Sequence, residues 1–176
     1  MPAGKTYENI GQTVTLGSNT LSYTFTNISQ NYTDLILVGN TKASVTGAAT
    51  SFRVNNLTSV ADYGHAYLSR SGATTYSGNE FNSAYGVCQW FTTPGTTDGC
   101  MFITEFLNYT GTHHNKTYWS RATSLGSDSS YQGNDMISGT VNTTSAITSI
   151  KLSMQENASN TINAGSTFTL YGIKAA

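Results

Sequence analysis

The sequence predicts an all-β protein, a single antiparallel β-sandwich of jelly-roll-like type, and three observations predict it. Ser, Thr and Asn supply 66 of the 176 residues, and these side chains disfavour helix interiors because they compete for backbone hydrogen bonds. Aromatic residues make up 11% of the chain and provide core material that disordered chains lack. Short segments of alternating polar and apolar residues recur between turn signals. One sandwich domain, residues 1–176, accounts for the length.

Alternation along the chain predicts about nine or ten short strands, drawn from eleven candidate segments. In chain order the expected strand segments are Thr13–Leu16, Leu21–Thr26, Leu35–Val38, Ser51–Val54, Tyr63–Tyr67, Val87–Phe91, Met101–Tyr109, Thr117–Thr123, Met136–Val141, Ile147–Met154 and Thr167–Ile173. The continuous apolar run Leu35–Val38 predicts a central strand covered on both faces. In Ile147–Met154, we expect Ile150, Leu152 and Met154 to share one face.

Turn residues divide these strands and predict the loops. Pro94, Gly95, Asp98 and Gly99 separate Val87–Phe91 from Met101–Tyr109, which is the clearest hairpin signal in the chain. The segment Ser69–Ser83 is rich in Gly, Ser and Thr, and it is the longest predicted loop. A second long polar loop is expected at Gly126–Asn134.

Two cysteines, Cys88 and Cys100, flank the turn of the predicted hairpin. A hairpin would bring them close, but disulfides are rare in a reducing cytoplasm, so we expect two buried thiols. Two cysteines alone are also too few ligands for a metal site.

The charge of the chain argues against several classes of partner. Only 10% of residues are charged, the net charge is −1 and the eight basic residues are scattered, so no positive field exists to bind nucleic acid. No apolar run approaches the roughly 20 residues that cross a membrane. The first residues lack the apolar stretch of a secretory signal, and we therefore expect the protein to fold in a cytoplasm.

The chemistry-bearing residues do not form a recognisable catalytic or metal-binding motif. The nine acidic residues are dispersed, and Glu105 with Asp135 is the one carboxylate pair that could be proposed for hydrolysis. Glu105 lies in a predicted strand, where we expect it to face solvent. His113 and His114 are adjacent, and two neighbours on a strand would point to opposite faces.

His65 has no partner at motif spacing, and the loop at 126–135 lacks the spaced acids of a calcium loop. We therefore expect no metal, no cofactor and no enzymatic activity.

Three parts of the chain resemble the small Ser/Thr-rich β-structured virion proteins of tailed bacteriophages. They are Tyr7–Gly17 with Thr15-Leu16-Gly17-Ser18, then Tyr32–Val38, and then Ala146–Ile150 together with Gly165–Lys174. The segment from about Gly39 to Ser145 does not contribute to the resemblance. The resemblance implies a non-enzymatic component on the surface of a capsid or tail, with no catalytic residues to carry over.

Within that family the absence of shaft repeats and heptads favours a capsid decoration, or cement, subunit over a tail fibre. Such a subunit would bind the major capsid protein or other virion proteins on the outer surface of the virion, and we expect a homotrimer. The alternative is a tail-fibre or tail-tip module that binds host surface polysaccharide. Its aromatic contacts would be Tyr76, Trp119 and Tyr131, because exposed rings stack on sugars.

Overall fold

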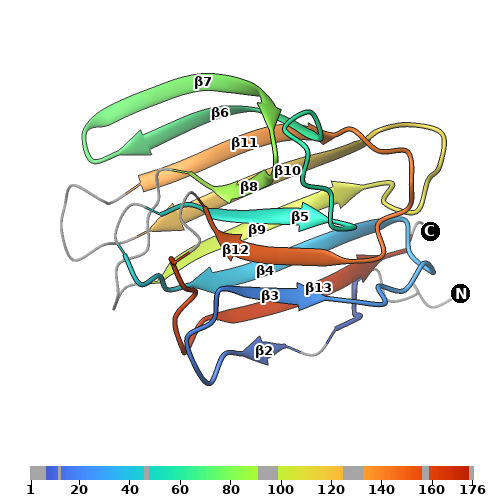
Figure 1. Ribbon diagram of the computed structural model, residues 1–176, viewed down its shortest axis with the longest axis horizontal. Coiled ribbons are helices and arrows are strands. Elements are labelled where there is room, and N and C mark those ends of the chain that lie inside the picture. Colours follow the sequence, from blue (N-terminus) through green and yellow to red (C-terminus); the bar gives the residue numbers. More distant parts are fainter. Residues whose placement is uncertain are drawn as a thin grey trace, which may run out of the picture.

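Two antiparallel sheets build the protein in the computed structural model, which describes residues 7–11, 13–45, 48–90, 99–124, 133–155 and 159–174 (Figure 1). The larger sheet has nine strands in the order β1 (Tyr7–Asn9), β13 (Thr167–Ile173), β4 (Asp34–Thr41), β9 (Cys100–Leu107), β10 (Lys116–Ser124), β11 (Gly133–Val141), β6 (Tyr63–Ser71) and β7 (Thr74–Ser83), with β2 (Val14–Thr15) also paired to β13. The smaller sheet has the order β3 (Ser22–Phe25), β12 (Ile150–Met154), β5 (Thr50–Val54) and β8 (Gly86–Gln89).

The smaller sheet lies over the middle of the larger one, and the core fills the space between them (Figure 1). Phe52 on β5 is fully buried and meets the rings of Phe106 on β9 and Tyr118 on β10 edge to face, at centroid distances of 5.0 and 4.8 Å. The predicted all-β antiparallel sandwich is therefore confirmed. We call the face of the nine-stranded sheet that packs on the smaller sheet its inner face, and the opposite one its outer face.

Strict alternation of burial shows how the sequence positions side chains on these two faces. Along β10 every second residue is buried and the residues between are exposed, because successive side chains of a strand point to opposite faces. The expected shared face of Ile150, Leu152 and Met154 is confirmed, since all three are buried, although β12 begins at Ile150 rather than Ile147.

The central apolar strand differs from its prediction. β4 lies between β13 and β9, as a central strand should, but within the apolar run Leu35–Val38 only Leu35 and Leu37 are fully buried. Ile36 and Val38 are partly exposed on the outer face. The expectation that this run is covered on both faces is therefore wrong, because the described residues place no second layer outside the nine-stranded sheet.

Two predictions about loops are also wrong. β8 pairs with β5 in the smaller sheet, whereas β9 pairs with β4 and β10 in the larger one, so the expected hairpin between them does not form. The expected loop Ser69–Ser83 is instead the β6–β7 hairpin, which turns at Gly72 with a positive φ of 58°. Glycine adopts that conformation without strain. The described residues contain no helix long and apolar enough to cross a membrane.

Candidate functional site

The one carboxylate pair suggested by the sequence is not assembled in the structure. Glu105 lies on the outer face of the nine-stranded sheet and is partly exposed, as expected. Asp135 lies on the inner face, is 2% exposed and accepts a hydrogen bond from the backbone N–H of Trp90 at 2.7 Å. Because the two carboxylates lie on opposite faces of one sheet, they cannot flank a common substrate.

The aromatic residues predicted for partner or glycan contact also do not form one platform. Trp119 is 50% exposed and pairs with Glu105 and Ser138 across the outer face. Tyr76 is 39% exposed, but it pairs with the buried Ser69 and therefore belongs to the inner face at the β7 edge. Tyr131 lies outside the described residues. Trp119 and Tyr76 thus cannot contact the same small ligand.

A contiguous apolar area covers the outer face over β1, β13, β4 and β9. We call it the outer apolar face, and its side chains are Tyr7, Ile36, Val38, Met101, Ile103 and Tyr171. Cross-strand pairing places Val38 beside Ile103 and Ile36 beside Tyr171. Met101 is 57% exposed and Tyr7 is 60% exposed. Contiguous exposed apolar side chains of this kind mark interaction surfaces.

Two shallow hollows of about 400 and 340 Å³ lie on the outer apolar face and share Val38, Ile103 and Arg121 in their walls. Neither is lined by a group of acids, histidines or cysteines. In the described part of the chain, no three such residues come together in a way that would bind a metal ion. Both hollows are lined mainly by apolar side chains.

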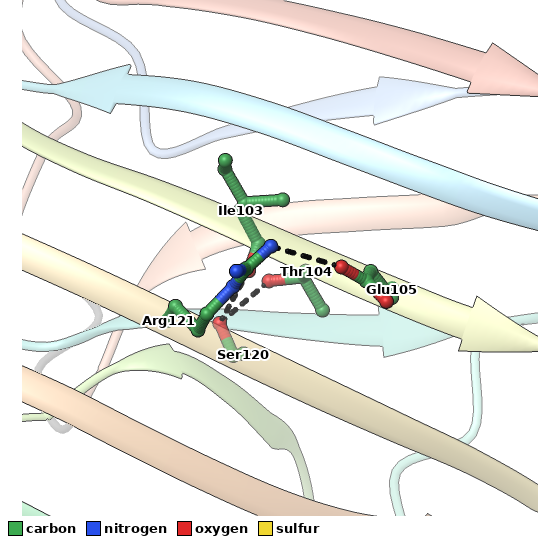
Figure 2. Close-up of polar contacts among 5 residues, drawn as sticks. All are labelled: Ile103, Thr104, Glu105, Ser120 and Arg121. Carbon is green, nitrogen blue, oxygen red and sulfur yellow. Dashed lines mark hydrogen bonds and ion pairs between the residues drawn. The ribbon is translucent and has the colours of Figure 1, made fainter. Parts of the chain in front are cut away.

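An ion pair borders this area on the β10 side. Figure 2 shows Arg121 reaching from β10 to β9, where its Nη2 lies 3.1 Å from Oε1 of Glu105. On the opposite face of the same two strands, the hydroxyls of Thr104 and Ser120 share a buried hydrogen bond of 2.8 Å. The ion pair is exposed and contributes little to stability on its own, but it fixes the position of a positive and a negative group beside the apolar side chains.

Sequence reasoning missed the outer apolar face. The signal was present in Met101–Leu107, where Met101, Ile103 and Leu107 alternate with the buried Phe102 and Phe106. A strand that is apolar at nearly every position is buried on one face and either covered or available for binding on the other.

A buried histidine lies on the inner face near the β7 edge. Neither imidazole nitrogen of His65 has a hydrogen-bond partner, and Nε2 is 3.6 Å from Oε2 of Glu80. Burial lowers the pKa of His65 to about 4, because the loss of hydration outweighs the attraction of the nearby carboxylate. The ring lies 5.3 Å from that of Trp90, which stacks on Tyr67 at 5.5 Å.

The two cysteines are buried thiols, which matches the expectation even though the hairpin that suggested their proximity does not exist. Burial raises the pKa of the Cys88 thiol to about 12, so it is a poor nucleophile at neutral pH. His113 and His114 are exposed in the segment between β9 and β10. Most of the predicted polar loop at 126–134 lies outside the described residues.

Comparisons with known proteins find similarity at the level of structure. No protein-family model and no curated protein matches the sequence. Among solved structures, the chain is similar to the galectin LEC-6 of Caenorhabditis elegans with a TM-score of 0.33 and 9% sequence identity, over 93% of this chain and 96% of the galectin.

Proposed function

We propose that the protein is a non-enzymatic virion structural protein of a tailed bacteriophage, a capsid decoration or cement subunit that binds on the outside of the particle and stabilises the capsid. Its partners are the major capsid protein or other virion proteins, and further copies of itself in a homotrimer. It is assembled in the host cytoplasm. The resemblance of Tyr7–Gly17, Tyr32–Val38 and the two segments between Ala146 and Lys174 supports the virion assignment.

The observation that carries the proposed binding role is the outer apolar face. It presents exposed apolar side chains on regular strands, where backbone pairing holds them in place before a partner arrives, so little entropy is lost on binding. Arg121 and Glu105 at its border supply charge complementarity, which orients a partner more than it adds affinity. Each Å² of apolar surface that a partner covers on this face would favour binding by roughly 25 cal/mol.

The copy number of the protein in purified virions tests the assignment, measured by quantitative mass spectrometry against the major capsid protein. We expect a copy number comparable with that of the capsid protein. A far lower number would place the protein on the tail, in the alternative role of a host-recognition module, and contradict capsid decoration. Absence from virions would contradict the virion assignment itself.

A charged substitution tests whether the outer apolar face is the binding surface. Ile103 is 36% exposed, so Ile103→Asp should fold normally while placing a desolvated charge in the interface. We expect this variant to be lost from particles at an unchanged melting temperature. The matched control is Leu21→Asp, at a position 55% exposed beside the smaller sheet. Equal retention of both variants would show that another surface binds.

A further inference from the structure

A groove on the outer face lies at the β7 side of the sheet, away from the outer apolar face. It has a volume of about 450 Å³ and runs over β10, β11, β6 and β7, which are neighbours along one margin of the sheet (Figure 1). Trp119 on β10 forms one wall and Phe81 on β7 the other. Three strand spacings separate the walls, roughly 14 Å, which leaves room for a ligand of two or three linked rings.

The two aromatic walls are unusually exposed for their size. Phe81 is 77% exposed and Trp119 is 50% exposed, whereas the large rings of Phe52, Phe102, Phe106 and Phe168 are almost fully buried in the core. Nothing in the described fold covers either ring. Their large apolar faces are therefore available to a ligand, and flat rings bind other flat apolar faces at low entropic cost.

The floor of the groove is open because its residues are small. Cross-strand pairing places Ser138 between Trp119 and Ala66, and Gly64 lies two residues before Ala66 on the same face of β6. Gly64 has no positive φ. A Cβ atom added there would lie 3.5 Å from the carbonyl oxygen of Glu80, an ordinary contact. Neither backbone conformation nor packing requires glycine at this position, so its effect in this structure is to keep the groove deep.

The polar groups of the groove are uncharged and available. Asn79, Thr117, Ser138 and Thr140 line it, and within the described residues the structure gives none of their side chains a hydrogen bond. His65 and Tyr118 border the groove from the buried side of the sheet. Burial lowers the pKa of His65 to about 4 and raises the pKa of Tyr118, so both are neutral at pH 7.

We infer that this groove binds a neutral saccharide, with a sugar ring stacked on Trp119, a second contact to Phe81, and hydroxyls bonded to the amide and hydroxyl side chains between them. The combination of exposed rings and uncharged hydrogen-bonding groups matches a ligand that has apolar C–H faces and many hydroxyls. An anionic ligand would find no cation among the lining residues. This inference does not depend on the location of the protein in a virion.

Binding is tested with the purified protein on an array of immobilised neutral hexose and N-acetylhexosamine oligosaccharides, with sialylated counterparts for comparison. We expect binding to neutral glycans without preference for the sialylated ones, and we expect soluble forms of the bound glycans to perturb Trp119 fluorescence. Failure to bind any neutral glycan, or a preference for the sialylated set, would overturn the inference.

Three variants localise the site. Trp119→Ala removes the stacking surface, and Ala66→Leu leaves both aromatic walls intact while filling the floor from an exposed position. We expect each to weaken binding at least tenfold without a change in melting temperature. The control is Tyr76→Ala, which removes an exposed aromatic ring from the inner face at the same margin of the sheet and should bind as the unmodified protein does. Unchanged binding by the first two variants, or equal loss in the control, would place the sugar elsewhere.

Discussion

Replacing Phe52 by alanine should remove a large part of the stability of the sandwich. The ring is fully buried and contacts Tyr63, Phe106 and Tyr118 edge to face, with centroid distances from 4.8 to 6.0 Å. It therefore joins the smaller sheet to three strands of the larger one, β6, β9 and β10. A side chain of about 200 Å² leaving the core forfeits roughly 25 cal/mol per Å², and a cavity remains. The expected loss in the free energy of unfolding is about 5 kcal/mol, at the upper end of the range measured for Phe→Ala changes in cores.

Urea denaturation followed by tryptophan fluorescence measures this loss, since Trp90 directly follows β8 of the smaller sheet and Trp119 lies on β10 of the larger one. The matched control is Phe81→Ala, the same chemical change at a 77% exposed position, where we expect a change within about 0.5 kcal/mol. A loss below about 2 kcal/mol for Phe52→Ala, or a comparable loss at Phe81, would refute the assignment of Phe52 to the centre of the core.

Two further predictions concern pH and close packing. His65 has a lower pKa in the folded protein, about 4, than in the unfolded chain, so the unfolded chain binds more protons between pH 6.5 and 4. The free energy of unfolding should fall by on the order of 3 kcal/mol as the pH drops through that window. Urea denaturation at a series of pH values measures this loss, and His65→Phe should flatten the dependence of the free energy of unfolding on pH between 6.5 and 4. The same pH dependence in the variant and in the unmodified protein would contradict the prediction. A Cβ added at Gly86 would lie 2.1 Å from Cζ of Phe52, so Gly86→Ala should cost about 1–3 kcal/mol by overpacking. Gly17→Ala meets nothing within 4 Å and should leave the melting temperature unchanged, and equal melting temperatures for the two variants would show that the core adapts.

Local alternation could predict the strands that have one buried face but not the partners with which they pair. The burial of Leu152 between partly exposed neighbours follows from a period of two, which the sequence displays directly. The pairing of β8 with β5 depends on a close approach that no local pattern reveals, in which the ring of Phe52 occupies the space that a side chain at Gly86 would need. Turn residues between β8 and β9 therefore suggested a hairpin that the core does not allow.

In the candidate sites, too, local alternation predicts some features, whereas others depend on strand pairing that the sequence does not reveal. The exposure of Trp119 follows from its place between the buried Tyr118 and Ser120. The face occupied by Tyr76 could not be predicted, because β7 is an edge strand with few apolar residues, held by backbone pairing to β6. Its composition is that of a loop, and composition does not report backbone hydrogen bonds. Sequence reasoning missed Phe81 as a wall of the groove because the composition of β7 predicted a loop rather than a strand.

The order of strands in the sheets has a consequence for synthesis on the ribosome. β13 pairs with β1, β2 and β4, so the pairing of Asp34 with Ile173 cannot form until β13 has been synthesised. In the same way, β3 cannot pair until β12 has been synthesised. At ordinary translation rates the early strands emerge on the order of ten seconds before their partners. Such distant pairings also slow folding, because loop closure must precede the contacts that reward it. The nascent chain thus cannot complete the larger sheet stepwise from its first strands. One edge of the apolar β4 can pair with β9 once that strand is made, but the other edge stays unpaired until β13 is made.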